Sequence, residues 1–295
     1  MSKFRAHETF FIRKGWLYKG LKYIVSEPLL FSGQVGNPMD ILGLGSNMVK
    51  SLRYWLQAVG LTMEPTSGKR HQSLTESFGN IVWQFDPYIE EMGTLWLLNY
   101  KLATNEKLAT AWFYFFNIFR MNEFSKEEFV SGLEHYVHYV LDENVSKNSL
   151  EDDFNCIINT YVSRLKLHPE KVHPESNIDC PLAELGIIDI VSKKERLYKK
   201  SEPQKEALHP LIVLAVILDR AGDRKEIKIG DLKDEINNIG KVFNLDMILL
   251  TYYLNKISSL GYIKVKRTAG LDVINVQTTM SFKECVELYY NEING

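Results

Sequence analysis

Several features that define common protein classes are scarce or missing in this 295-residue sequence. It contains only three cysteines, all widely spaced, and no Cys-x-x-Cys or Cys/His ligand pair, which argues against a structural zinc site. Such sparse cysteine is typical of a reducing cytoplasm, so we expect a cytoplasmic protein. The N-terminal segment carries the charged residues Lys3, Arg5 and Glu8 and has no apolar h-region, so no signal peptide is expected. The apolar run 211–218 is too short to span a bilayer.

Net charge is small, but its distribution is uneven. The chain carries −2 overall, which excludes a generic polycation. Residues 1–70 hold ten basic against four acidic residues, a balance of +6, whereas residues 71–160 hold five against fourteen, a balance of −9. A basic segment on an acidic body is typical of a polyanion-binding module whose remainder stays off the polyanion. The alternative is chance clustering of charge on solvated faces.

The order of elements predicted for the basic segment is that of a helix-turn-helix. Apolar spacing predicts a helix over 13–26, followed by a short helix over 37–42 with Asn37 as its cap. Gly43 and Gly45 then form a turn, and Ser46 caps a helix that ends near residue 59. The exposed face of this last helix and its neighbourhood supply the predicted DNA contacts: Arg13, Lys14, Ser46, Asn47, Lys50, Arg53, Gln57, Lys69 and Arg70.

A basic wing is expected after this helix. A strand over 61–64, a loop over 68–71 and a return strand over 80–85 would place basic side chains at its tip. An ordinary helical hairpin is the alternative. The fold predicted for the whole chain is mainly α, with winged-helix modules over 1–103 and 209–295, a helical middle domain over 104–208, and short β-hairpins.

The middle domain is predicted to be built around buried aromatic residues. A helix over 109–120 holds six of them with one cation, so a core role is favoured over a base-stacking platform. Ser125 begins a capping box, Ser149 is expected to cap a helix reaching residue 162, and 193–205 is expected to be a charged, mobile linker.

The C-terminal region predicts three helices and a hairpin. The helices are expected over 210–218, from 230 to 237, and from Asp246 to 260, and the strands over 262–267 and 273–276. The third helix exposes few cations, so protein–protein packing is one expectation there. Secondary DNA contact through wing residues Lys264, Lys266 and Arg267 is the other.

Five sequence blocks carry a family resemblance. They are His7-Glu8-Thr9-Phe10-Phe11-Ile12-Arg13-Lys14-Gly15-Trp16-Leu17, residues 42–55 (LGLGSNMVKSLRYW), Gly93-Thr94-Leu95-Trp96-Leu97-Leu98, Glu151-Asp152-Asp153-Phe154-Asn155-Cys156, and Cys180-Pro181-Leu182-Ala183-Glu184-Leu185-Gly186. Together they resemble a bacterial domain family of unknown function, over nearly the whole chain. Its genes tend to lie beside phosphosulfate-reductase-like sulfurtransferases in phage-defence islands. One branch is similar to the SspB proteins, DNA-nicking subunits of the single-strand DNA phosphorothioation system.

The resemblance implies a DNA-binding component of a DNA phosphorothioation or phage-defence system. DNA and a sulfurtransferase-like protein are the expected partners, no membrane is expected, and a homodimer is left open. Three alternatives remain: a DNA nickase using Mg²⁺ or Mn²⁺, a non-enzymatic adaptor that brings the sulfurtransferase to DNA, and a winged-helix transcription regulator.

Catalytic residues are not evident from the sequence. No nuclease-type string of carboxylates stands out, and no metal ligand set is assigned. Two acidic runs, 86–91 and 151–153, are candidates to bind a cation, although such runs are usually solvated helix starts. His7 and Glu8 are the weak catalytic candidates, because they lie in the most distinctive block near Arg13 and Lys14; a local hydrogen-bonding role for His7 is the alternative.

Overall fold

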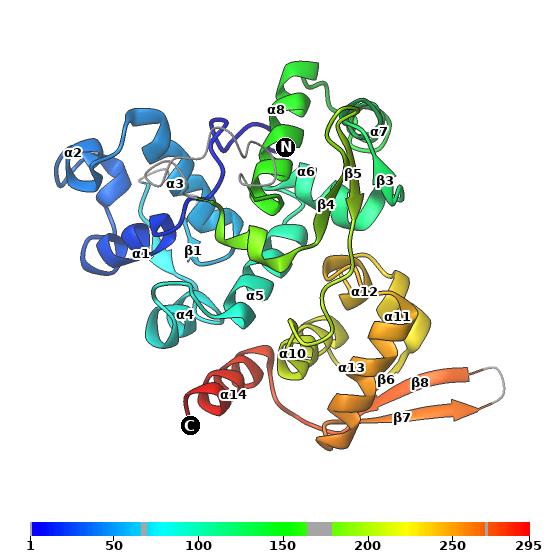
Figure 1. Cartoon of the computed structure of the whole chain (residues 1–295). Helices are drawn as coiled ribbons and strands as arrows, with labels where there is room; N and C mark the ends of the chain where they lie inside the picture. The colour runs from blue at the N-terminus through cyan, green and yellow to red at the C-terminus, as the bar shows by residue number, and fades with distance from the viewer. Residues whose placement is uncertain (1, 66–69, 164–178, 269–270) are drawn as a thin grey trace. The chain divides into compact units, whose positions relative to one another are not determined.

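The computed structural model describes residues 2–65, 70–163, 179–268 and 271–295, and it divides into two compact units, 1–201 and 202–295. Within these ranges the chain is mainly helical with three small antiparallel sheets (Figure 1). This confirms the predicted fold class at the level of secondary structure. No helix of the described ranges has the length and apolar character needed to cross a membrane.

The first unit begins with the expected helices. Its first elements are α1 (Trp16–Ser26), η1 (Leu30–Ser32), α2 (Pro38–Leu42), α3 (Ser46–Ala58), β1 (Thr62–Met63), β2 (Ser73–Leu74), α4 (Gly79–Phe85) and α5 (Met92–Ala103). The Asn37 side chain caps α2 by accepting the Met39 N–H at 3.1 Å, as predicted. Ser46 is not a cap: Gly45 holds that position, with no side-chain hydrogen bond, and Ser46 is the first helical residue.

The expected return strand over 80–85 is wrong. Thr62 and Met63 pair with Ser73 and Leu74, so a hairpin exists but closes earlier in the chain. Residues 80–85 lie in α4, where Ile81 and Val82 are both buried, a helical rather than an alternating pattern. The helix lies directly beside β1: a Cβ on Gly79 would stand 1.9 Å from the Leu61 carbonyl oxygen.

An aromatic core fills the second half of this unit. It is formed by α6 (Thr110–Phe113), the π-helix η2 (Tyr114–Ile118), α7 (Lys126–Tyr139) and α8 (Lys147–Tyr161). All six aromatic residues from Trp112 to Phe119 are buried, which confirms their core role. The Ser125 capping box is confirmed, whereas the cap of α8 is Ser146 and not Ser149.

A three-stranded sheet covers this core and consists of β3 (Glu123–Phe124), β4 (Ile188–Ser192) and β5 (Leu197–Lys200), in the order β3-β5-β4. The short helix η4 (Pro181–Leu185) precedes β4 in the chain. The expected mobile linker over 193–205 is therefore wrong in its middle, because β5 pairs with both neighbours. Lys200 is inward-facing: its Nζ donates to the Phe115 and Phe119 carbonyls at 2.7 and 2.6 Å.

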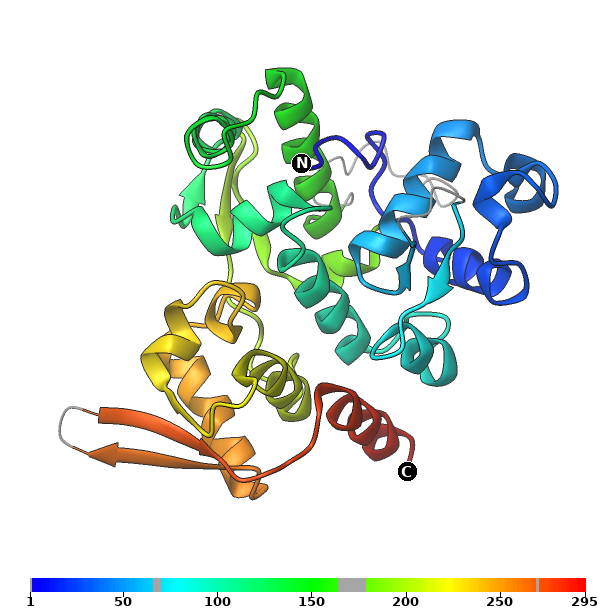
Figure 2. The same ribbon diagram turned by 180° about the vertical axis from the view of Figure 1, so that it is seen from behind.

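The second unit contains more elements than predicted. It consists of α10 (Pro210–Ala221), β6 (Glu226–Lys228), α11 (Ile229–Asp234), α12 (Ile239–Val242), α13 (Met247–Ser259), β7 (Ile263–Thr268), β8 (Leu271–Val276) and α14 (Phe282–Asn294). The Asp246 cap and the β7–β8 hairpin are confirmed. Strand β6, which adds to the hairpin in the order β6-β8-β7, and helices α12 and α14 were not foreseen. Figure 2 shows the hairpin extending beyond the helices of its own unit.

Candidate functional site

The first unit contains a cleft of about 600 Å³ whose charged lining comes from three separate segments. The N-terminal segment, helix α3 and the β1–β2 hairpin each contribute charged side chains. The charged lining consists of the cations Lys3, Lys50, Arg53 and Arg70 and the carboxylates Glu8 and Glu64. Cations thus outnumber carboxylates, as an anionic ligand requires.

Helix α3 holds the centre of the cleft. Its apolar residues Leu52, Trp55 and Leu56 are buried, which turns Lys50 and Arg53 outward. Arg53 forms two contacts with the Glu64 carboxylate, one from Nε to Oε2 at 3.0 Å, and its side chain stays 31% exposed. This pairing fixes the guanidinium plane and leaves one edge for another acceptor.

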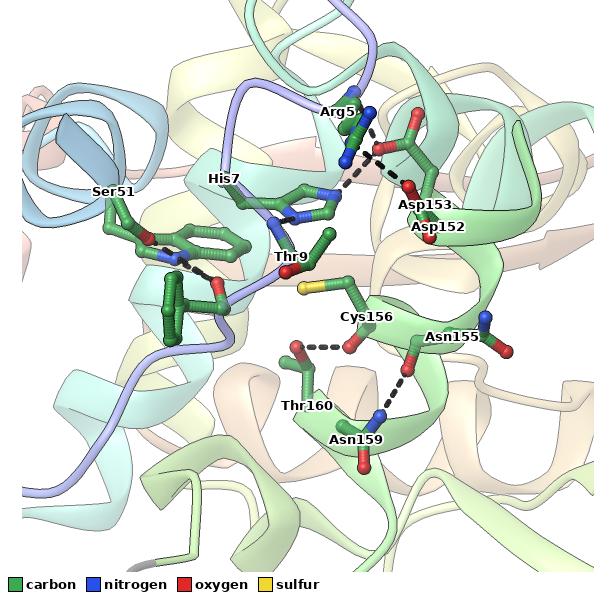
Figure 3. A network of polar contacts seen from close by, with 12 residues as sticks. Arg5, His7, Thr9, Ser51, Asp152, Asp153, Asn155, Cys156, Asn159 and Thr160 are labelled. Carbon is green, nitrogen blue, oxygen red and sulfur yellow. Dashed lines mark hydrogen bonds and ion pairs between the residues drawn. The ribbon is translucent and has the colours of Figure 1, made fainter. Parts of the chain in front are cut away.

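The N-terminal segment is held against α8 by a buried polar pair (Figure 3). The His7 Nε2 lies 2.7 Å from Asp153 Oδ1, and both side chains are buried, at 0% and 2% exposed. The same oxygen accepts the Arg5 N–H at 2.8 Å, and His7 Nδ1 accepts the Thr9 N–H at 3.1 Å. Because Nδ1 is an acceptor, Nε2 carries the proton that His7 donates to Asp153.

Aromatic rings enclose this pair. His7 stacks on Trp55 at 6.1 Å between centroids and meets the edge of Trp112 at 5.8 Å. Burial raises the pKa of the Asp153 carboxyl above its ordinary value, against the opposing effect of the His7 hydrogen bond. The His7 ring is therefore fully enclosed, as the local hydrogen-bonding alternative for this residue expects, and its contacts link the N-terminal segment to α8.

Glu8 differs from its neighbour, because it lines the cleft. Its backbone is left-handed at φ 50°, and Thr9 follows at 66°. Arg70, on the opposite wall, is also left-handed at 48°. Non-glycine residues rarely adopt this conformation, which costs roughly 1–3 kcal/mol each and is common at ligand sites. The anchored His7 thus fixes a strained turn that presents Glu8.

The remaining predicted contact residues are spread more widely. Arg13 lies over the rings of Phe10 and Trp16, at 5.7 and 5.2 Å, and neither Arg13 nor Lys14 lines the cleft. Gln57 does line it, Ser46 and Asn47 are exposed at the start of α3, and Lys69 lies outside the described residues. In the second unit the expected wing cations are all exposed: Lys264, Lys266 and Arg267.

The acidic runs do not form a metal site in the described parts of the chain. Asp86 accepts the N–H groups of Glu90 and Glu91 and the Thr94 hydroxyl, so it serves as a local cap. Glu151 pairs with Lys126 at 2.6 Å and Asp152 with Arg5 at 2.9 Å. No group of three or more His, Cys, Asp or Glu residues is gathered there to hold a metal ion.

Three residues were not assigned their present contacts from the sequence. Glu64 carried no signal beyond its charge, and Lys3 was noted only as an N-terminal charge. Asp153 did carry one: it is the last of three consecutive acids, and it falls on the α8 face shared with buried Cys156, three residues later. Helical phase therefore separates it from Asp152 and Glu151.

The fold and the cleft define a mainly helical, two-unit protein with a cation-lined cleft built around its N-terminal segment. The chain matches the family described as "Protein of unknown function (DUF4007)" over residues 4–290, and it belongs to that family. No curated protein matches it.

Among solved structures the fold is similar to SspB in two crystal structures. A magnesium ion-bound SspB matches with a TM-score of 0.85 and 24% identity, covering 100% of this chain and 90% of that one. A second SspB structure matches with a TM-score of 0.83 and 24% identity, covering 100% and 88%. The two matches show a common fold over the full length of the chain.

Proposed function

We propose that this protein is the DNA-binding component of a DNA phosphorothioation or phage-defence system, and that its N-terminal cleft holds the DNA backbone. The observation that carries the proposal is the convergence of Lys3, Lys50, Arg53 and Arg70 on one cleft. Clustered lysine and arginine side chains are the main source of DNA affinity, since they displace condensed counterions from phosphates. The resemblance to SspB in fold is consistent with this role.

The arrangement around the cleft also suggests how DNA is presented to it. Helix α2, the Gly43 turn, helix α3 and the β1–β2 hairpin follow the order of a small winged helix, with α3 as the recognition helix. In the second unit, α10, β6, α11 to α13 and β7–β8 follow the same order. That unit supplies a secondary DNA contact through the exposed wing cations Lys264 and Lys266, while α13 exposes mainly uncharged residues.

A salt titration of DNA binding tests the proposal. The variant Lys50→Gln with Arg70→Gln removes two cleft cations and spares Arg53, whose loss would leave Glu64 unpaired. We expect weaker binding and a slope of log K against log salt that falls by about one for each lost phosphate contact.

The matched control removes two exposed lysines that do not line the cleft, Lys22 on α1 and Lys147 on α8. Its affinity and slope should stay close to those of the unmodified protein. Equal losses in both double variants would show that net charge, and not the cleft, governs binding. An unchanged cleft variant that remains folded would refute the proposal.

DNA nicking is a second candidate function, favoured by the presence of Glu8 among the cleft cations on a strained turn. The assay is conversion of supercoiled plasmid to open circles, with Mg²⁺ or Mn²⁺ supplied. If the protein nicks, Glu8→Gln should abolish nicking and leave DNA binding nearly intact. If DNA is bound and never nicked, the protein is a non-enzymatic adaptor that brings a sulfurtransferase-like partner to DNA, or a transcription regulator.

A further inference from the structure

A second pocket of the first unit has a lining unlike that of the cleft. It encloses about 310 Å³ between α8, the start of α7 and the β4–β5 hairpin. Its charged lining consists of three cations, Lys126, Lys193 and Arg196, with no carboxylate among the lining residues. Lys126 is notable because only five basic residues occur among the 90 residues from 71 to 160.

The three cations of the pocket differ in their acidic partners among the described residues. Lys126 is held by Glu151, a residue outside the pocket lining, at 2.6 Å. Among the described residues, neither Lys193 nor Arg196 has a carboxylate within ion-pair distance, and both are exposed. Unpaired cations that face one concavity attract an anion strongly, and a guanidinium beside an ammonium suits a phosphate.

The rest of the pocket lining suits an aromatic ring of a ligand. The Tyr198 ring is half-buried and meets the Phe154 ring at 5.9 Å, which gives the pocket one aromatic wall. Asn155 and Asn159 come from the face of α8 turned away from His7, as Figure 3 shows for Asn155. Side-chain amides present both donors and acceptors, the pairing that base edges require.

The hairpin is also shaped locally at this point. The β4–β5 register shifts between Ile190 and Ser192, which both line the pocket, and Arg196 is left-handed at φ 52°. Such a bulge redirects side chains and is common beside binding sites. The turn thereby directs Lys193 and Arg196 to the same side as the aromatic wall.

We propose that this pocket binds a mononucleotide, with its phosphate held by Lys193 and Arg196 and its base against Tyr198. The volume lies at the lower end of the range of about 300–1,000 Å³ for small-ligand sites, which accommodates a mononucleotide and excludes a duplex. The site is separate from the proposed DNA cleft, with which it shares no lining residue.

Calorimetric titration of the full chain with AMP, ADP and ATP tests this assignment, with adenosine and inorganic phosphate as partial ligands. We expect at least one nucleotide to bind, adenosine to bind about tenfold or more weakly because it lacks the charge-assisted contacts, and phosphate to compete. Lys193→Gln with Arg196→Gln should weaken nucleotide binding about tenfold or more for the same reason.

Two controls locate the binding. Lys194→Gln removes an exposed turn cation that does not line the pocket, and should leave affinity unchanged. Lys50→Gln with Arg70→Gln should also leave it unchanged, so that binding in the DNA cleft is distinguished. The assignment is overturned if no nucleotide binds at millimolar concentration, or if the Lys193/Arg196 variant binds as well as the unmodified protein. It is also overturned if short single-stranded DNA, and no mononucleotide, occupies the pocket.

Discussion

Truncation of Asp153 should destabilise the first unit strongly, because one of its carboxylate oxygens accepts hydrogen bonds from two residues of the N-terminal segment. In Asp153→Ala the His7 Nε2–H and the Arg5 N–H both lose their acceptor. A buried donor left unsatisfied costs about 1–3 kcal/mol, so the two together cost about 2–5 kcal/mol, with the partly buried Arg5 amide at the lower end. For a unit of this size the melting temperature should fall by on the order of 10 °C.

Tryptophan fluorescence isolates this effect, since all five tryptophans lie before residue 202 and therefore report on the first unit. The matched variant Asp153→Asn keeps an acceptor oxygen for both donors and replaces only Oδ2, which has no hydrogen-bond partner. Its loss should be clearly smaller than that of Asp153→Ala. A melting temperature of Asp153→Ala within about 2 °C of the unmodified protein would refute the anchoring role, since that shift corresponds to less than about 1 kcal/mol.

Three further results are expected. Burial raises the folded-state pKa of Asp153, so between the unfolded and folded pKa values the folded form binds more protons than the unfolded form. The unfolding free energy of the unmodified protein relative to Asp153→Asn should therefore be greatest below about pH 4 and decline as pH rises through the folded-state pKa. A pH-independent difference in denaturant titrations would contradict this. The three buried thiols, Cys156, Cys180 and Cys285, should not react with a disulfide reagent in the native protein at pH 8. Burial raises the pKa values of all three, and those of Cys180 and Cys285 to about 12. Fast labelling of the native protein would contradict the fold. Gly79→Ala should lower the melting temperature markedly, because the new Cβ would collide with the Leu61 carbonyl oxygen. In the control Gly43→Ala the new Cβ meets no atom within 4 Å, so the only cost is that of a left-handed backbone at a non-glycine residue. Equal melting temperatures of the two variants would contradict the packing of α4.

Sequence patterns predicted those elements whose signals are local. The Asn37 and Asp246 caps, the Ser125 capping box and the β7–β8 hairpin depend on residues a few positions apart, and all four are confirmed. Two local predictions failed, since the caps expected at Ser46 and Ser149 belong to Gly45 and Ser146. The larger failure occurred where the partners of a strand were distant in sequence. Strand β5 was mistaken for part of a linker because its charged residues gave no alternation, and only pairing with β3 and β4 makes it a strand.

The site shows the same division between local and distant signals. The charge asymmetry of the chain and the exposed face of α3 were sufficient to select Lys50 and Arg53, since helical spacing alone sets which residues share a face. Only the tertiary structure placed the adjacent residues His7 and Glu8 in opposite surroundings, one buried and the other in the cleft lining. Asp153 lies 146 positions from His7 in the sequence. The rings of Trp55 and Trp112 pack against the imidazole, while the left-handed turn leaves Glu8 in the cleft. Sequence composition thus determined which kind of ligand to expect, and long-range packing decided which side chains are available to meet it.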